Sequence, residues 1–548
     1  MSLDPPDAGA PSPPASRGSV PLPPHPARRD ALPWWVIGLL AVFAALRLTE
    51  AATAPQQSSR VGSRLAQKAD GSLDSSSMQD LIQADLKAKT AYALSLAQSA
   101  SPGAVVHPDV PSLQDALKAA ETLLGESHAP GAARRVILLR ALLAQRAVPP
   151  LAAVHGFVPL DAFTNALPAD LPAPDKARYG AEGRLWQTVF EGGRLTPKQT
   201  AAAAAQIRAL PGIRWWRNPA LQALYGAQGD LSEANRFARA AQRDALPFLA
   251  PVVVLILFRV GLMLLGGAWL LYFLVRPKNE GAGLWPTVPA AVPDAERRLG
   301  AGDLMAVFVV YLLAREVIGW TLTGFGIPHR FHVSGLLTPY LPLLKALPAA
   351  RRSAVSVGLE AAVYVLSAVP PILYLWAMAR ARGASLAREI GWQARPAGRN
   401  LLYGLGGFGV ASALMLPAAL IGRAVFRHAP DPSNPVIPQL VGASGVGTIL
   451  LLVGLASVAA PLVEEVLFRG VLYQAARLKL GVWPAIVVTG LVFGFAHPVG
   501  VAEMLAIAVL GGVFAWMAET RKSLLPSMFA HCLQNLSTTL LLLFILAG

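Results

Sequence analysis

The stretch PLVEEVLFRG, residues 461–470, places two adjacent glutamates and an arginine inside an otherwise apolar run that begins near Ile449. On an α-helix Glu465 and Arg469 are four residues apart and share a face, so their charges can neutralise each other, whereas Glu464 points about 100° away. A lone carboxylate in hydrocarbon costs at least about 2.5 kcal/mol, so ionisable residues at such depth usually face a polar cavity and serve a function. The stretch therefore predicts a membrane helix that carries a polar site.

The composition is that of an integral membrane protein. Of 548 residues, 54% are hydrophobic and 14% are charged, and several apolar runs approach the roughly 20 residues that cross a bilayer. The net charge of +15 does not indicate nucleic-acid binding, because the sequence has no basic stripe with interleaved aromatic residues. We predict an all-α fold, a polytopic transmembrane helical bundle with an inserted soluble α-helical domain. The candidate spans are residues 33–48, 247–275, 304–323, 354–378, 401–422, 448–474, 483–497, 501–518 and 524–546.

The basic residues lie next to the apolar runs. Arginines and lysines at 28–29, 276–278 and 380–399 fall on one side if the spans cross alternately, and the positive-inside rule assigns that side to the cytoplasm. The arginines at 351–352 fall on the other side and oppose this assignment. The predicted location is the bacterial inner (cell) membrane, with multiple crossings.

Five segments follow from these boundaries. Residues 1–32 are rich in Pro, Ala and Ser and are predicted to be a disordered tail, since they cannot bury a core. Residues 33–48 form a transmembrane anchor, for which cleavage as a signal peptide is the alternative. A soluble domain at 52–246, extracytoplasmic if the anchor crosses, precedes the span 247–275, and residues 300–548 form a multi-helix membrane domain.

The soluble domain is predicted to consist of short amphipathic helices. Thr196-Pro197-Lys198-Gln199 has the pattern of a capping box that opens an alanine-rich helix. Ser112 and Asp230 are candidate caps of two further helices. Such helices could bind a protein partner or simply pack together, and the sequence favours neither.

Two later spans carry further polar residues. FGFAHP places His497 at the end of an apolar run one turn after Phe493, and MFAHCLQN places His531 and Asn535 on one helical face. A lone histidine in a helix is more often a packing residue than a catalytic one. At about 1.5 Å of rise per residue these groups and Glu464 reach similar depths, so the sequence predicts that they meet near the middle of the membrane.

The three motifs occur in an order that is typical of one family. EExxxR from Glu464, FxxxH from Phe493 and HxxxN from His531 resemble the motifs of the CAAX-processing and bacteriocin-processing (CPBP/Abi) intramembrane protease family, which includes the type II CAAX prenyl endopeptidase. The resemblance covers about residues 400–548, the protease-like core. It implies an enzyme, an intramembrane endopeptidase that hydrolyses a peptide bond of a membrane-associated or lipidated substrate.

The resemblance also implies roles for individual residues. Glu464, helped by His497, would polarise the attacking water as general base. His531 and Asn535 would donate hydrogen bonds to the tetrahedral oxyanion. Glu465 and its partner arginine would hold the helix and orient the first glutamate.

A zinc site is a second reading of the same groups. One glutamate with two histidines, Glu464, His497 and His531, is a plausible zinc set, although the sequence contains no HExxH motif. Metal-activated water and metal-free glutamate catalysis therefore both remain open.

Two rival functions are considered. Ser444 within GASG, together with His497, resembles the dyad of rhomboid serine proteases, but that chemistry gives the EExxxR helix no task. Cys532 lies off the His531 face and is expected only to fill space. The other rival is a non-catalytic membrane scaffold or bacteriocin-immunity protein, in which the polar residues only lock the helices together.

Overall fold

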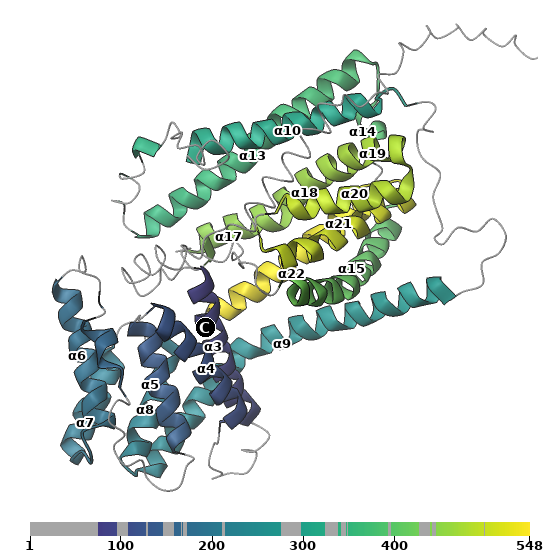
Figure 1. Cartoon of the computed structure of the whole chain (residues 1–548). Helices are drawn as coiled ribbons and strands as arrows, with labels where there is room; N and C mark the ends of the chain where they lie inside the picture. Colours follow the sequence, from purple (N-terminus) through teal and green to yellow (C-terminus); the bar gives the residue numbers. More distant parts are fainter. Residues whose placement is uncertain are drawn as a thin grey trace, which may run out of the picture.

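The residues that the structure describes fold into helices and their connections. The computed structural model describes residues 75–95, 108–127, 130–145, 158–165, 167, 173–210, 214–275, 297–323, 338–340, 343, 347, 349–392, 396–426, 439–440, 445–497 and 499–547. Within these ranges there are helices and no strand, so the predicted all-α fold is confirmed (Figure 1). The predicted tail at 1–32 and the anchor at 33–48 lie outside them.

The N-terminal helices pack around a core of their own. Its largest fully buried side chains include Trp186, Tyr92 and Phe163. The Tyr92 hydroxyl donates to the Gln222 side chain at 2.5 Å, which satisfies a polar group inside the core. The helices are α3 (Ser75–Leu94), α4 (Val110–Ser127), α5 (Pro130–Ala144), α6 (Ala173–Phe190), α7 (Pro197–Ala209) and α8 (Arg217–Ala227), with 3₁₀ turns at Leu160–Phe163 and Arg214–Trp216.

The caps of these helices agree with the sequence in two cases of three. The capping box of α7 is formed, since the Thr196 side chain accepts from the backbone of Gln199 and the Gln199 side chain accepts from the backbone of Thr196. Asp230 accepts from a backbone N–H three residues later, as predicted. The prediction for Ser112 was wrong, because Asp109 caps α4 and accepts from the Ser112 backbone at 3.0 Å. The helix therefore begins about one turn earlier in the chain than predicted, and the Asp109 carboxylate accepts from a backbone N–H of its first turn.

An ion pair joins three helices of this domain. Asp85 on α3 accepts two hydrogen bonds from Arg135 on α5, at 2.6 and 2.9 Å, and one from the Trp216 indole at 2.8 Å. Burial alone would raise the pKa of the Asp85 carboxyl, but the Arg135 guanidinium and the hydrogen bonds hold that pKa below its usual value. The ionised carboxylate therefore stabilises the folded domain.

Asp85→Asn is expected to lower the free energy of unfolding of this domain by about 1.5–3 kcal/mol, the range for hydrogen bonds to charged groups. Because the folded pKa of Asp85 is depressed, the wild-type advantage is present above the usual aspartate pKa and is lost as the pH falls below it. Urea unfolding of the full-length protein in detergent at several pH values measures both effects. Asp115→Asn is the matched control, since Asp115 is 68% exposed and its ion pair with Lys87 is long, at 4.0 Å, so it should contribute little. Equal losses in the two variants would contradict the expectation.

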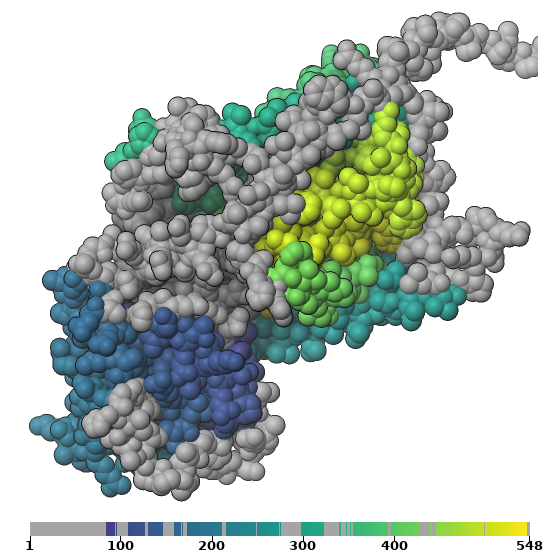
Figure 2. All heavy atoms as spheres, viewed as in Figure 1, coloured from purple at the N-terminus to yellow at the C-terminus, as the bar shows by residue number. Residues whose placement is uncertain are grey.

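The N-terminal helical domain continues into the membrane domain through one helix. Helix α9 (Leu231–Val275) begins in the core of the N-terminal domain and includes the span Leu249–Tyr272. The structure shows no break at 246/247, the predicted domain boundary, even though Pro247 and Pro251 lie inside the helix. In the space-filling view the N-terminal helical domain, in purple and blue, and the C-terminal helices, in yellow-green, form two lobes, and the teal helix α9 extends along the second (Figure 2).

The predicted spans from residue 247 onward all coincide with helices. Five helical segments in the described residues are long and apolar enough to cross a membrane: Leu249–Tyr272, Ala354–Ala381, Ala397–Val425, Val446–Leu480 and Val501–Arg521. The remaining described elements of the membrane domain are α10 (Ala301–Thr323), a 3₁₀ turn (Thr338–Tyr340), the short α14 (Leu386–Glu389), the shorter apolar helix α20 (Val482–Phe495) and α22 (Leu525–Ala547). The protein is a multi-pass integral membrane protein.

Small residues allow the membrane helices to pack closely. Helix α15 (Ala397–Val425) crosses α9 where Gly409 and Gly266 meet, and a Cβ at either glycine would overlap the backbone of the other helix. A Cβ at Gly494 of α20 would likewise overlap the Met504 carbonyl of α21 (Val501–Arg521). Such backbone contact is typical of membrane helix interfaces. It packs α15, α20, α21 and α22 into one bundle (Figure 1).

Arg259, which interrupts the predicted span 247–275, has partners inside the bundle. Its guanidinium donates to Gln534 at 3.0 Å and to Thr538 at 3.1 Å, both on α22. The side chain therefore faces a neighbouring helix, as expected for an arginine within a membrane span.

Candidate active site

The glutamates at 464 and 465 lie on a long helix with two π-helical segments. This helix comprises α17 (Val446–Gly454), a π segment (Leu455–Ala459), α18 (Ala460–Glu465), a second π segment (Val466–Leu472) and α19 (Tyr473–Leu480). Both glutamates end α18, directly before the second π segment. π-Bulges inside α-helices occur frequently at functional sites.

The predicted pairing of Glu465 with Arg469 is confirmed. Arg469 Nη1 donates to Glu465 Oε1 at 2.9 Å, and both side chains are fully buried. Arg469 Nη2 donates to the Gly511 carbonyl of α21 at 3.0 Å, and the guanidinium lies over the ring of Phe493 with 4.3 Å to its centroid. Further hydrogen bonds from neighbouring helices help a buried charge pair to persist, and here Gly511 and His531 supply them, while Glu465 Oε2 and Arg469 Nε are buried without a hydrogen-bond partner among the described residues.

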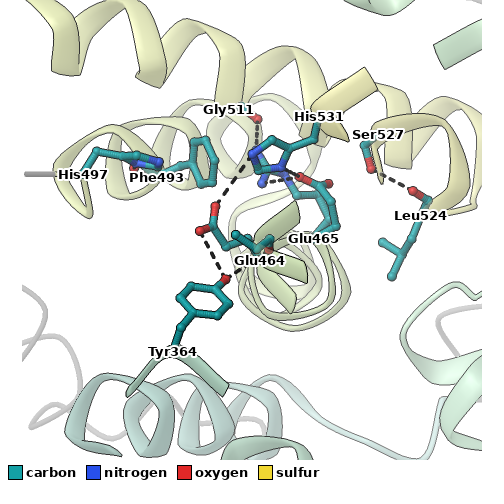
Figure 3. Close-up of polar contacts among 11 residues, drawn as sticks. Tyr364, Glu464, Glu465, Phe493, His497, Gly511, Leu524, Ser527 and His531 are labelled. Atoms are coloured by element: carbon teal, nitrogen blue, oxygen red, sulfur yellow. Dashed lines mark hydrogen bonds and ion pairs between the residues drawn. The ribbon is translucent and has the colours of Figure 1, made fainter. Parts of the chain in front are cut away.

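His531 lies between the two glutamates. Its Nδ1 is 2.9 Å from Glu465 Oε1 and its Nε2 is 3.8 Å from Glu464 Oε2 (Figure 3). Because Glu465 is paired with Arg469, its carboxylate is ionised and accepts the hydrogen on Nδ1. The other ring nitrogen is thereby directed at Glu464, which is 16% exposed while His531 is 2% exposed. The predicted proximity of Glu464 and His531 is confirmed.

Asn535 is held against the helix that carries the glutamates. Its Nδ2 donates to the Ala456 carbonyl at 2.8 Å. In the π segment the Ala460 N–H donates to Leu455, and the residue five positions after Ala456 is Pro461, which has no N–H. The Ala456 carbonyl thus lacks a helical donor, and Asn535 supplies one.

His497 is placed differently from the prediction. Helix α20 ends at Phe495, so His497 follows the helix, and its Nδ1 lies 2.7 Å from the Phe493 carbonyl. A carbonyl only accepts, so the hydrogen is on Nδ1 and the lone pair of the neutral ring is on Nε2. The Phe493 ring lies between His497 and His531, with ring centroids 4.8 and 5.6 Å away (Figure 3).

The described residues do not fit a zinc site. The predicted set was Glu464, His497 and His531, yet no three His, Cys, Asp or Glu side chains are grouped to hold a metal in the part of the chain that the structure describes. The two imidazoles are separated by the Phe493 ring, and Nδ1 of each is already hydrogen-bonded. No step below is therefore assigned to a metal.

The sequence motifs did not identify two residues that lie near Glu464. The Tyr364 hydroxyl, on α13 (Ala349–Ala381), lies 3.3 Å from Glu464 Oε1, and the charge of Arg315, on α10, interacts with Glu464. Arg315 interrupts an apolar run, so the argument applied to the glutamates would have identified it. A tyrosine in a membrane helix gives no comparable signal. Ser444, the nucleophile of the rhomboid alternative, lies outside the described residues.

The comparisons with known proteins agree with the motifs. Residues 446–537 match the family described as type II CAAX prenyl endopeptidase Rce1-like, which confirms the predicted family resemblance. The matched region includes both glutamates, both histidines and Asn535, and covers less than half of the chain. The family points to CAAX-type intramembrane protease activity. No curated protein and no solved structure matches the chain.

Proposed function

We propose that the protein is an intramembrane endopeptidase that hydrolyses a peptide bond of a membrane-associated or lipidated substrate with water activated by Glu464. The observation that carries the proposal is the row of three groups in which His531 bridges Glu465 and Glu464, with 3.8 Å between Nε2 and Glu464 Oε2. That distance is too long for a direct hydrogen bond but suits one water molecule bound by both groups.

Glu464 is the general base of this mechanism. Its carboxylate takes a proton from the water as the oxygen attacks the scissile carbonyl carbon, and the same proton is then available to the leaving amine. His497 lies on the other side of the Phe493 ring from His531, and its Nε2 lone pair can accept a hydrogen bond from the substrate. Glu464 is the least buried of the two adjacent glutamates, with 16% exposure against 0% for Glu465, which suits a group that must meet a substrate.

The oxyanion is stabilised by groups on α22. The Asn535 amide carries two N–H groups, so one can donate to the developing oxyanion while the other holds Ala456. His531, whose Nδ1 lies 2.9 Å from Glu465, directs its Nε2 toward Glu464, and a ring that carries a hydrogen on Nε2 would donate a second hydrogen bond to the oxyanion. Glu465 and Arg469 thereby orient the reacting groups without touching the substrate.

Cleavage is expected to survive metal removal. Because no three donors converge at the site, the rate after exhaustive chelation should stay within about twofold of the untreated rate, with residual metal measured by elemental analysis. Restoration by added zinc of an activity lost on chelation would contradict this mechanism and favour the zinc reading.

Comparison of membrane peptides from cells with the wild-type protein and with Glu464→Gln tests the substrate class. We expect uncleaved precursors that are lipidated or membrane-embedded to accumulate in the variant, in the bacterial inner membrane. Identical peptide inventories would oppose the proposal. A scaffold or immunity protein predicts such identity, together with full biological function of the variant.

A further inference from the structure

Helices outside the family-matching region reach the candidate active site. Helices α10 and α13 precede residue 446, pack against each other, and lie along the side of the glutamate-bearing helix that faces away from α20 and α21 (Figure 1). Glu465 contacts His531 of α22, whereas Glu464 lies near both His531 and Tyr364 of α13. The surroundings of Glu464 are thus built from both parts of the membrane domain.

Tyr364 of α13 contacts the turn that carries Glu464. Its hydroxyl oxygen lies 3.1 Å from the Ala460 carbonyl and 3.3 Å from Glu464 Oε1. Residues 460 and 464 are adjacent on one helical face, so one hydroxyl reaches both. A phenol has a single hydrogen and donates to one acceptor at a time. Figure 3 shows Tyr364 and His531 on opposite sides of the Glu464 carboxylate. The two contacts therefore limit where that carboxylate can point.

Arg315 of α10 contacts the end of α20. Its Nη1 donates to the carbonyl of Ala496 at 3.3 Å, the residue before His497. The charge of this guanidinium also acts on Tyr311, Glu316, Glu464 and Tyr364. For Glu464 it is a second nearby positive charge beside Arg469, whose hydrogen bond goes to Glu465. A charge at this depth usually has such a partner.

We propose that Tyr364 and Arg315 are positioning residues of the active site: Tyr364 fixes the Glu464 carboxylate, and Arg315 fixes the loop that carries His497. This inference rests on the proposed function. Its consequence is that the segment matched by the family is not sufficient for full activity, because two of the groups that set its geometry come from α10 and α13.

Tyr364→Phe tests this with the loss of one oxygen atom. With a quenched fluorescent peptide that ends in a farnesylated CAAX sequence, in liposomes, we expect kcat to fall about tenfold with KM unchanged within twofold, because a lost hydrogen bond to a carboxylate has about this effect. Tyr374→Phe is the matched control, since Tyr374 lies on the same helix with 40% of its side chain exposed. It should keep the wild-type kcat and KM.

Substitution of Arg315 provides a second test of the positioning proposal. Arg315→Lys retains the positive charge and should keep more of kcat than Arg315→Gln, which retains polarity but no charge. Thermal unfolding in detergent checks that each variant is folded. A purely structural role for either residue would change stability and the amount of folded protein, but not kcat per folded molecule.

The outcomes separate this inference from the proposed function. If Glu464→Gln is inactive while Tyr364→Phe and Arg315→Gln keep wild-type kcat, the positioning proposal is wrong and the proposed function stands. If Glu464→Gln itself cleaves the probe at the wild-type rate, the proposed function fails, and Tyr364 has no catalytic base to position. A kcat loss in Tyr364→Phe that is absent in Tyr374→Phe supports the inference.

Discussion

Glu464→Gln is expected to lower the rate of peptide cleavage by about 10²–10⁴-fold, the usual contribution of a general acid or base. The amide keeps the size and shape of the side chain and can still accept from Tyr364, so the helix packing around it should be unchanged. It cannot take a proton from water. Cleavage of the farnesylated peptide probe, normalised to folded protein in the membrane, measures the effect.

Ser444→Ala serves as the control for the rival chemistry. A Glu464-based mechanism predicts that this variant keeps nearly the wild-type rate, while a serine protease with Ser444 and His497 as its dyad predicts a complete loss. The opposite pattern, an active Glu464→Gln and an inactive Ser444→Ala, would establish the rhomboid alternative. The two variants therefore decide between the two classes of protease.

The sequence predicted the parts of the site that depend on position along one helix. The four-residue spacing of Glu465 and Arg469 determines their shared face, and the lengths of the apolar runs determine the depth at which Glu464 and His531 lie. Helix spacing and rise are properties of the backbone. Both could therefore be derived from the residues alone.

The rest of the site depends on which helices become neighbours. Depth along a helix does not say which way it is rotated, so the contact of Tyr364 with Glu464 could not be predicted from one sequence. The hydrogen bond from Asn535 to the Ala456 carbonyl forms where a π segment is followed by Pro461, which has no N–H to donate to that carbonyl. Helix propensities do not predict a π segment. The end of α20 just before His497, by contrast, has a local cause in the sequence, because the proline at position 498 disfavours a helical conformation in the residue before it.

Glu465→Gln is expected to lower the free energy of unfolding by about 3–5 kcal/mol, because it removes one partner of a buried pair and leaves Arg469 charged. Both side chains are fully buried and 2.9 Å apart, so solvent cannot replace the lost carboxylate. Unfolding of the detergent-solubilised protein, followed by pulse proteolysis, measures this loss. Cleavage should fall as well, since His531 loses the acceptor that orients its ring.

Glu503→Gln is the matched control for that substitution. Glu503 also pairs with an arginine of another membrane helix, Arg423, but the pair is 3.5 Å apart with 33% and 68% exposure, and such surface pairs contribute little. Similar stability losses in Glu503→Gln and Glu465→Gln would contradict a special role for the buried pair.

Replacing both members of the buried pair separates stability from catalysis. A Glu465→Leu, Arg469→Met double variant leaves no uncompensated charge, and apolar replacement of a buried pair is often neutral or stabilising, so much of the lost stability should return. Cleavage should not return, because leucine offers His531 Nδ1 no acceptor and the ring is no longer directed at Glu464. Recovery of both stability and cleavage would show that the pair only holds the helices together, and His531 would then need another explanation for its orientation.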